Sequence, residues 1–175
     1  MTEIDEAPLD REAPPIEVRG LISRIGDRTI HDNLDLVVNR GDVVGVVGAS
    51  GTGKSVLLNT IIGLRSAEGG SVMIFGQDIR YARRPQWTAI NRRWGVLFQQ
   101  GALWSNLTVK ENVAAPLFEH TDMLKDEIDE LADLKIALAG LPPGAGALKP
   151  SELSGGMIKR ASLARALALD PELLF

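Results

Sequence analysis

Residues 48–55 read GASGTGKS, and their types and spacing suit a polyphosphate. The pattern needs a glycine, four residues, then Gly-Lys-Ser, which Gly48 and the Gly53-Lys54-Ser55 run supply. A polyphosphate concentrates negative charge, and backbone N–H groups are the densest donors a chain offers, provided that side chains stay away. Glycine has no Cβ, so the loop can wrap closely and adopt positive φ. Lys54 brings a point charge to the outer phosphates, and the Ser55 hydroxyl is placed to ligate Mg²⁺.

The flanking residues supply the elements that must position this loop. Residues 42–47 are apolar and β-branched, which predicts a buried parallel strand, and residues 56–64 carry apolar positions along one helical face with Gly63 near the end. The predicted helix points its positive end at the anion. A glycine-rich turn without a ligand is the alternative, but a bare turn needs neither the lysine nor the hydroxyl. We assign phosphate contacts to Gly48, Ala49, Ser50, Gly51, Thr52, Gly53, Lys54, Ser55 and Val56.

A second motif, LSGGM at residues 153–157, lies downstream of the loop. Two glycines expose backbone N–H groups, Ser154 adds a hydroxyl, and a helix beginning here adds positive potential. An ordinary helix start is the alternative, and it is weakened by the complete phosphate loop upstream. On these two motifs, the region from Ile16 to Phe175 resembles the ATP-binding subunit of ATP-binding-cassette (ABC) transporters.

The resemblance implies a site shared by two copies of the subunit, which bind ATP and Mg²⁺. Subunits of that family pair head to tail, so Ser154, Gly155 and Gly156 would meet the γ-phosphate held by the partner's loop. Gln99 matches the family's glutamine that senses Mg²⁺ and the γ-phosphate. The resemblance therefore assigns Ser55 and Gln99 to the metal.

A narrower likeness is to the ATPases of Mla-type and Mce-type lipid transport systems. It is carried by Met157, where most of the family has glutamine, and by the runs FQQGALW (98–104), NVAAPL (112–117), EHT (119–121) and PSELSGGM (150–157). The likeness implies an ATPase subunit that couples ATP hydrolysis to lipid transport, with phospholipid as the expected cargo. It also implies a membrane permease as partner, and a peripheral location at the cytoplasmic face of the bacterial inner membrane.

Two features depart from the family pattern. The family usually places an aromatic residue near position 25 to stack on adenine, whereas Ile25 offers dispersion without a π face. The Mg²⁺-binding Asp, the catalytic Glu and the switch His of the family would all follow Phe175. We therefore expect the chain to be a fragment with no catalytic residue of its own, inactive in hydrolysis, while the full-length protein is an ATPase.

Composition excludes several classes of protein. The chain has no cysteine, so disulfides and thiolate metal sites are excluded, and its hydrophobic fraction of 45% suits a folded core. The net charge of −4 comes from residues 1–19, which leaves a neutral body without the basic excess typical of nucleic-acid binding. Residues 1–15 read as a flexible, acidic tail, and no apolar run reaches the roughly 18 residues of a membrane span.

The fold class predicted is α/β, a phosphate-loop NTPase core of the RecA type with an antiparallel β layer ahead of it and a helical subdomain carrying LSGGM. The expected domain covers residues 16–175, incomplete at its C-terminal end, with the helical subdomain at about 108–165. The sequence also predicts strands at 16–25, 34–38, 71–75, 94–98 and from 171, a turn at 26–27, and helices at 108–115, 124–139 and 154–169. Thr108 and Glu111 form the pattern of a capping box.

The segment 101–107 is apolar and aromatic yet follows a strand end, so we expect it to dock the permease. The alternative is that Trp104 packs under the helical lobe. A soluble ABC-type ATPase without a permease is the competing function, and LSGGM argues against a small-molecule kinase. His31 and His120 have no ligand spacing and receive no role. The five arginines from residue 80 to residue 93 predict a solvated helix face, and contact with an anionic lipid or a partner loop is the alternative.

Overall fold

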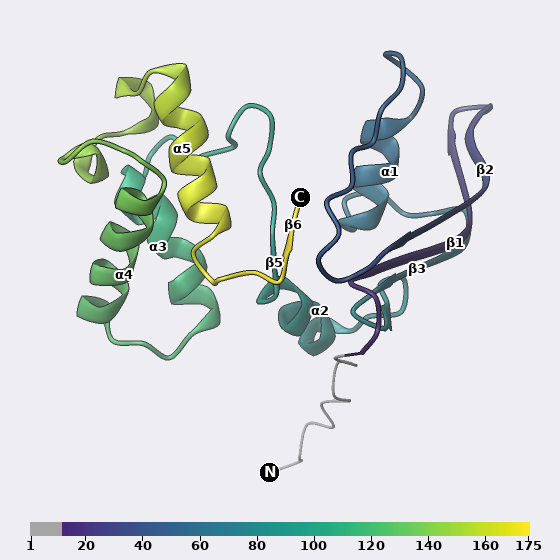
Figure 1. Cartoon of the computed structure of the whole chain (residues 1–175), viewed down its shortest axis with the longest axis horizontal. Helices are drawn as coiled ribbons and strands as arrows, with labels where there is room; N and C mark the ends of the chain where they lie inside the picture. The colour runs from purple at the N-terminus through teal and green to yellow at the C-terminus, as the bar shows by residue number, and fades with distance from the viewer. Residues whose placement is uncertain (1–11) are drawn as a thin grey trace, which may run out of the picture. The chain divides into compact units, whose positions relative to one another are not determined.

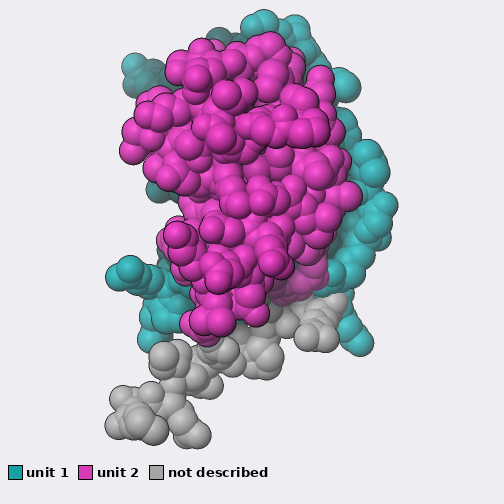
Figure 2. All heavy atoms as spheres, turned by 90° about the vertical axis from the view of Figure 1, so that its left-hand side faces the viewer, with its two compact units in different colours: residues 1–90 teal, residues 91–175 magenta. Residues whose placement is uncertain are grey.

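The structure, a computed structural model, describes residues 12–175 (Figure 1). The chain divides into two units at residues 90 and 91, which are coloured separately in Figure 2. Most of the tail predicted over residues 1–15 lies outside the described residues. At the inner end of that range, Pro15 is buried and its carbonyl accepts a hydrogen bond of 3.2 Å from the N–H of Phe75.

The first unit contains an antiparallel sheet in the order β2-β1-β3-β4. Its strands are β1 (Ile16–Ile25), β2 (Arg28–Val38), β3 (Gly69–Ile74) and β4 (Gln77–Asp78). The predicted first strand and the turn at 26–27 are confirmed, whereas the second strand begins at Arg28 instead of Leu34. The long hairpin forms the antiparallel layer that the sequence predicts.

An irregularity in β1 changes which of its residues face the core. The pairing register with β2 shifts between Val18 and Leu21, and again between Ser23 and Arg24. Ile16 and Val18 are buried before the first shift, and Leu21 and Ser23 after it, so the buried face moves from even to odd positions. A β-bulge has this effect because one extra residue reverses the alternation of side chains.

Two helices belong mainly to the first unit. α1 (Lys54–Ile61) follows the phosphate loop, buries Leu57 and Ile61, and is capped by Ile62. It begins two residues earlier and ends three residues earlier than the predicted range 56–64. α2 (Arg84–Asn91) lies within residues 80–93, where the arginines predict a solvated helix face, and its Trp87 lies against Gly63, just beyond the end of α1.

Residues 43–47 do not form the buried strand that the sequence predicts. No strand of the described chain pairs with them, and Val43 and Val47 are almost fully exposed. Their β-branched side chains suit an extended backbone, but this preference does not create a strand without a hydrogen-bonded neighbour.

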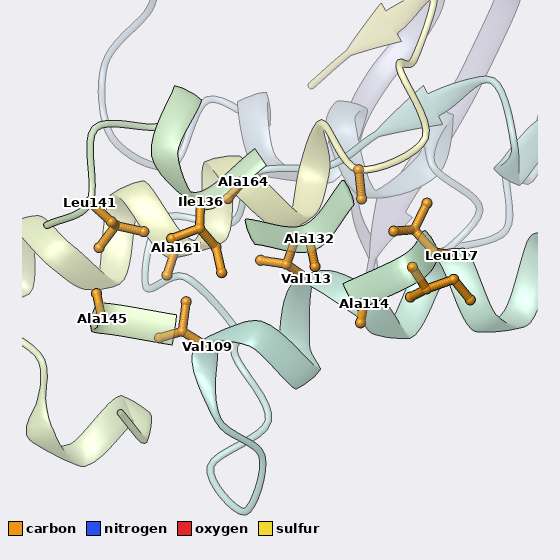
Figure 3. Close-up of a cluster of buried hydrophobic side chains, with 12 residues drawn as sticks. Val109, Val113, Ala114, Leu117, Ala132, Ile136, Leu141, Ala145, Ala161 and Ala164 are labelled. Atoms are coloured by element: carbon orange, nitrogen blue, oxygen red, sulfur yellow. The ribbon is translucent and has the colours of Figure 1, made fainter. Parts of the chain in front are cut away.

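The second unit is built on helices packed around one apolar cluster (Figure 3). α3 (Val109–His120), α4 (Lys125–Leu138) and α5 (Gly155–Ala166) match the three predicted helices, with short 3₁₀ turns η1 (Ala145–Ala147) and η2 (Pro150–Glu152). The predicted capping box at α3 is confirmed. In α5 the small side chains of Ala161 and Ala164 are fully buried, which permits close helix packing.

A short parallel pair completes the second unit. β5 (Trp94–Gly95) pairs with β6 (Leu173–Leu174), and the ring of Phe175 meets Trp94 edge-on at 5.6 Å between centroids. The predicted buried strand at 94–98 is therefore only partly correct, because Leu97 and Phe98 are both 39% exposed. The predicted α/β class, antiparallel layer and helical part are all present.

Asn112 is a fully buried polar residue that ties α3 to the preceding segment. Its Oδ1 accepts from the N–H of Trp104 at 2.8 Å, and its Nδ2 lies 3.1 Å from the Trp104 carbonyl, to which it donates. The same amide group also donates to the carbonyls of Leu107 and Thr108. One side chain thus satisfies several backbone groups that would otherwise be buried without partners.

We predict that Asn112→Ala lowers the free energy of unfolding by about 2–4 kcal/mol, because buried backbone groups lose their partner. Urea denaturation followed by circular dichroism measures the loss. Glu130→Ala, an exposed site on α4, is the control and should change the unfolding free energy by less than about 0.5 kcal/mol. Equal effects of the two substitutions would contradict the structural role of Asn112.

Candidate nucleotide-binding site

The loop at 48–53 has left-handed backbone at each of its glycines. The φ angles are 154° at Gly48, 80° at Gly51 and 103° at Gly53. The ammonium of Lys54 donates to the carbonyls of Gly48 at 2.6 Å and Ala49 at 2.7 Å. The Thr52 hydroxyl donates to the same Ala49 carbonyl at 2.8 Å. Two carbonyls of the loop are therefore satisfied from within it, and the lysine holds the loop wrapped.

The start of α1 is open to an anion. Gly53 is its N-cap, no side chain caps it, and no acidic residue lies in its first turn. The first N–H groups of a helix have no partner within the helix, and the helix dipole makes this end positive. Lys54 adds a full charge beside them, and Ser55 is exposed. A phosphate group suits this arrangement on charge and on hydrogen bonding.

Gly53 is also held closely against the hairpin. A Cβ at this position would lie 2.4 Å from Cγ2 of Ile30 and 2.8 Å from Nε2 of His31. Both distances are too short for any side chain, and the φ of 103° disfavours one as well. The position therefore requires glycine on two independent grounds, and β2 forms the surface on which the loop rests.

His31 and Ser23 form a buried polar pair under the loop. They oppose each other across β1 and β2, and Ser23 Oγ lies 2.6 Å from His31 Nδ1. Burial lowers the pKa of His31 below its ordinary value of 6.5, so the ring is neutral at pH 7. His31 belongs to no motif of the sequence. Its position under the loop follows from the register of the hairpin, which no local pattern reveals.

The described residues fit Mg²⁺ only in company with phosphate. Among residues 12–175 no group of three or more His, Cys, Asp or Glu side chains could hold a metal ion. Mg²⁺ bound to nucleotides takes few protein ligands and completes its shell with phosphate oxygens and water. The exposed Ser55 hydroxyl at the start of α1 suits this type of site, in which ATP would supply further ligands.

The remaining predicted site residues lie in the second unit, and the structure brings them to α5. Gln99 is exposed and lines a hollow of about 490 Å³ with Leu103, Pro150 and Ile158. Ser154 is the N-cap of α5, and its Oγ accepts from the N–H of Met157 at 3.3 Å. Gly155 and Gly156 are exposed, and a Cβ at Gly155 would meet nothing within 4 Å. Both glycines lie in the first turn of α5.

The segment after Gln99 is fastened to α5. Arg165 donates to the carbonyl of Ala102 at 2.7 Å and to that of Gly101 at 3.1 Å, and Ser162 also donates to Gly101. Gly101 approaches so closely that a Cβ would lie 2.7 Å from Cγ2 of Ile158. Arg165 belongs to none of the predicted sites, although an arginine within an alanine-rich helix is a signal of such a role.

The side chain of Trp104 is half-exposed and lies beside Arg165. Its exposed fraction is 51%, and the guanidinium carbon of Arg165 lies 5.1 Å from its ring centroid. Burial lowers the pKa of Arg165, whose guanidinium nevertheless stays charged at neutral pH. The alternative that Trp104 is a core residue is therefore wrong.

Fold and loop together define a phosphate-loop nucleotide-binding domain. The ABC transporter family matches residues 31–175, and the chain belongs to this family. The dimeric structure of a post-hydrolysis state of the ATP-binding cassette MJ0796, bound to ADP and Pi, is similar with a TM-score of 0.82 at 31% identity. That likeness covers 91% of this chain and 72% of the other.

Two similar proteins have names that refer to transport systems. The intermembrane phospholipid transport system ATP-binding protein MlaF of Haemophilus influenzae is 45% identical over 91% of this chain and 60% of its own length. The probable ribonucleotide transport ATP-binding protein mkl of Mycobacterium tuberculosis (strain H37Rv) is 44% identical over 91% of this chain and 44% of its own. The chain thus spans about 60% of the MlaF relative and less of mkl. Among residues 12–175 no helix is long and apolar enough to cross a membrane.

The close approach at Gly53 can be tested against Gly51, where a Cβ would meet nothing within 4 Å although φ is also positive. We predict that Gly51→Ala costs about 1–2 kcal/mol of stability through backbone strain. Gly53→Ala should cost roughly a further 1–3 kcal/mol, because its methyl group also collides with β2. Urea unfolding of both variants measures the difference. Similar losses would mean that the contact between loop and hairpin is not tight.

Proposed function

We propose that the chain binds ATP with Mg²⁺ at residues 48–56 and belongs to an ATPase that acts as a pair of subunits. The observation that carries the proposal is the wrapped loop, with the Lys54 ammonium held inside it and the uncapped start of α1 beside it. The similar cassette MJ0796, which is dimeric and bound to ADP and Pi, supports both the ligand and the pairing.

In this proposal the start of α5 faces the nucleotide of the second subunit. Ser154, Gly155 and Gly156 are exposed, and no acidic side chain lies in the first turn to repel a phosphate. We also propose that Gln99, next to α5, contacts Mg²⁺ and the γ-phosphate. Each subunit then supplies its phosphate loop to one nucleotide and its LSGGM motif, called the signature below, to the other nucleotide. Hydrolysis therefore requires the pair of subunits.

We further propose that the ATPase drives lipid transport, with phospholipid as cargo. Support comes from the phospholipid transport named for MlaF of H. influenzae and from the runs at 98–104 and 150–157. The name of mkl refers to ribonucleotide transport, so the relatives differ in named cargo. No membrane-crossing helix lies in the described residues, so the partner that we propose is a membrane permease at the cytoplasmic face of the bacterial inner membrane.

The surface around Trp104 is the proposed contact with that permease. Beside it lies a small hollow of about 180 Å³ that is lined by Trp104, Pro116, His120 and Arg165, among others. The Nδ1 atom of His120 is buried and has no hydrogen-bond partner among the described residues. An exposed aromatic ring beside an unsatisfied polar atom suits an incoming helix, which would cover the first and bond the second.

The role of the signature predicts a specific effect of Gly155→Asp. The new carboxylate would face the partner's γ-phosphate and repel it, whereas open space at Gly155 leaves the fold of the subunit intact. In the full-length protein we expect steady-state ATP hydrolysis to fall by roughly 100-fold or more, as when an electrostatic contact to the reacting group is lost. The affinity of the isolated subunit for MgATP should not change.

Two variants serve as controls for this experiment. Ser151→Asp adds the same charge at an exposed site before α5 and should retain hydrolysis. Lys54→Ala should abolish hydrolysis together with nucleotide affinity, since the outer phosphates lose their side-chain cation. Loss of nucleotide affinity in the Gly155→Asp monomer would refute the two-subunit role of the signature.

The docking proposal predicts that Trp104→Ala weakens co-purification of the permease with the full-length protein. Because the ring is half-exposed, the melting temperature and MgATP affinity of the free subunit should stay close to wild type. Tyr81→Ala, which removes an aromatic ring that is 76% exposed in the other unit, is the matched control and should not affect co-purification. If permease association survives the loss of Trp104, the surface around Trp104 is not the contact. A full-length wild-type protein that co-purifies with no permease would instead support the competing function, a soluble ABC-type ATPase.

A further inference from the structure

Ser23 and His31 form a buried, hydrogen-bonded pair beside Gly53 of the phosphate loop. Ser23 is 1% exposed and His31 8% exposed. Burying a hydroxyl and an imidazole costs free energy that their mutual hydrogen bond only offsets, and an apolar cross-strand pair would fill the space without that cost. Stability of the hairpin alone therefore does not account for the pair.

The geometry connects the pair to the loop. Nδ1 of His31 is engaged by Ser23, which fixes the plane of the ring. Nε2, on the opposite side of the ring, faces Gly53, where a Cβ would come within 2.8 Å of it. Gly53 is the N-cap of α1 and immediately precedes Lys54 and Ser55. A movement of the ring therefore moves the residues on which the phosphate site depends.

We propose that His31, oriented by Ser23, is a positioning residue that sets the place of Gly53 and so aims the start of α1 at a bound polyphosphate. The inference rests on the proposed binding of nucleotide at this loop. It assigns to His31 no contact with the substrate. Its effect passes through the backbone of Gly53, which is why the pair is buried and why glycine is required where the ring and the loop meet.

A bound polyphosphate would change the electrostatic environment of the His31 ring. Burial keeps His31 neutral in the free protein. Ser23, which faces the ring from β1, is uncharged, and Lys54 is the charged side chain of the loop, with its ammonium on the Gly48 and Ala49 carbonyls. The neighbouring Asp32 on β2 is exposed. A polyphosphate brings negative charge close to the ring and favours its protonated form, so nucleotide binding should raise the pKa of His31.

The test compares MgADP binding by the full-length protein and by its Ser23→Val/His31→Leu double variant, which replaces the pair by apolar residues. We expect the variant to keep its melting temperature within a few degrees and to bind MgADP roughly tenfold more weakly, the lower end of what is lost when an outer support of a binding site is removed. Ser23→Ala, which keeps the ring but frees it, should lose part of the affinity. Thr29→Val, an exposed site on the same hairpin, is the control.

A second readout follows the His31 ring by NMR as the pH is lowered, with and without MgADP. A higher His31 pKa in the complex, and MgADP affinity that rises as pH falls between the free and bound pKa values, support the inference. Unchanged MgADP affinity in the double variant, or a His31 signal indifferent to MgADP, overturns it and leaves nucleotide binding intact. If the wild-type protein fails to bind MgADP at all, the proposed function fails, and this inference fails with it.

Discussion

The contact between the Lys54 ammonium and the carbonyls of Gly48 and Ala49 is the interaction on which the rest of the site depends. A loop with three left-handed glycines has little intrinsic preference for one shape, and glycine loses more conformational entropy on ordering than any other residue. The lysine offsets that cost by bridging the loop from within. The charge that we propose for the phosphate would therefore also preorganise the loop before phosphate arrives.

The sequence predicts best where the signal is local. The capping box at Thr108, the turn at 26–27 and the three long helices of the second unit depend on neighbouring residues and are found as expected. Prediction fails at residues 43–47 and 97–98, where a β-branched or aromatic run reads as a buried strand. Whether such a run is a strand depends on a partner far along the chain, and propensity carries no information about that partner.

The loop and the signature residues are recognisable because their chemistry dictates their types, whereas the supporting residues are not. Ile25 lies opposite Arg28 across the turn at 26–27. In a regular hairpin without a register shift, Ser23 would therefore lie opposite Ile30. The shift in register between Ser23 and Arg24 places His31 there instead. A single irregularity thus decides which side chain is the cross-strand partner of Ser23. Arg165 could not be predicted for a similar reason, since its partners are backbone carbonyls far along the chain.

α5 links two surfaces of the second unit through one rigid element. Its first residues carry the exposed glycines, and Arg165 near its end holds the segment that bears Trp104. A helix of 12 residues is about 18 Å long and transmits displacement without bending unless proline or a bulge interrupts it. The anchored segment also follows Gln99 directly. A displacement of the glycines along the helix axis would therefore also displace Arg165 and the segment that bears Trp104.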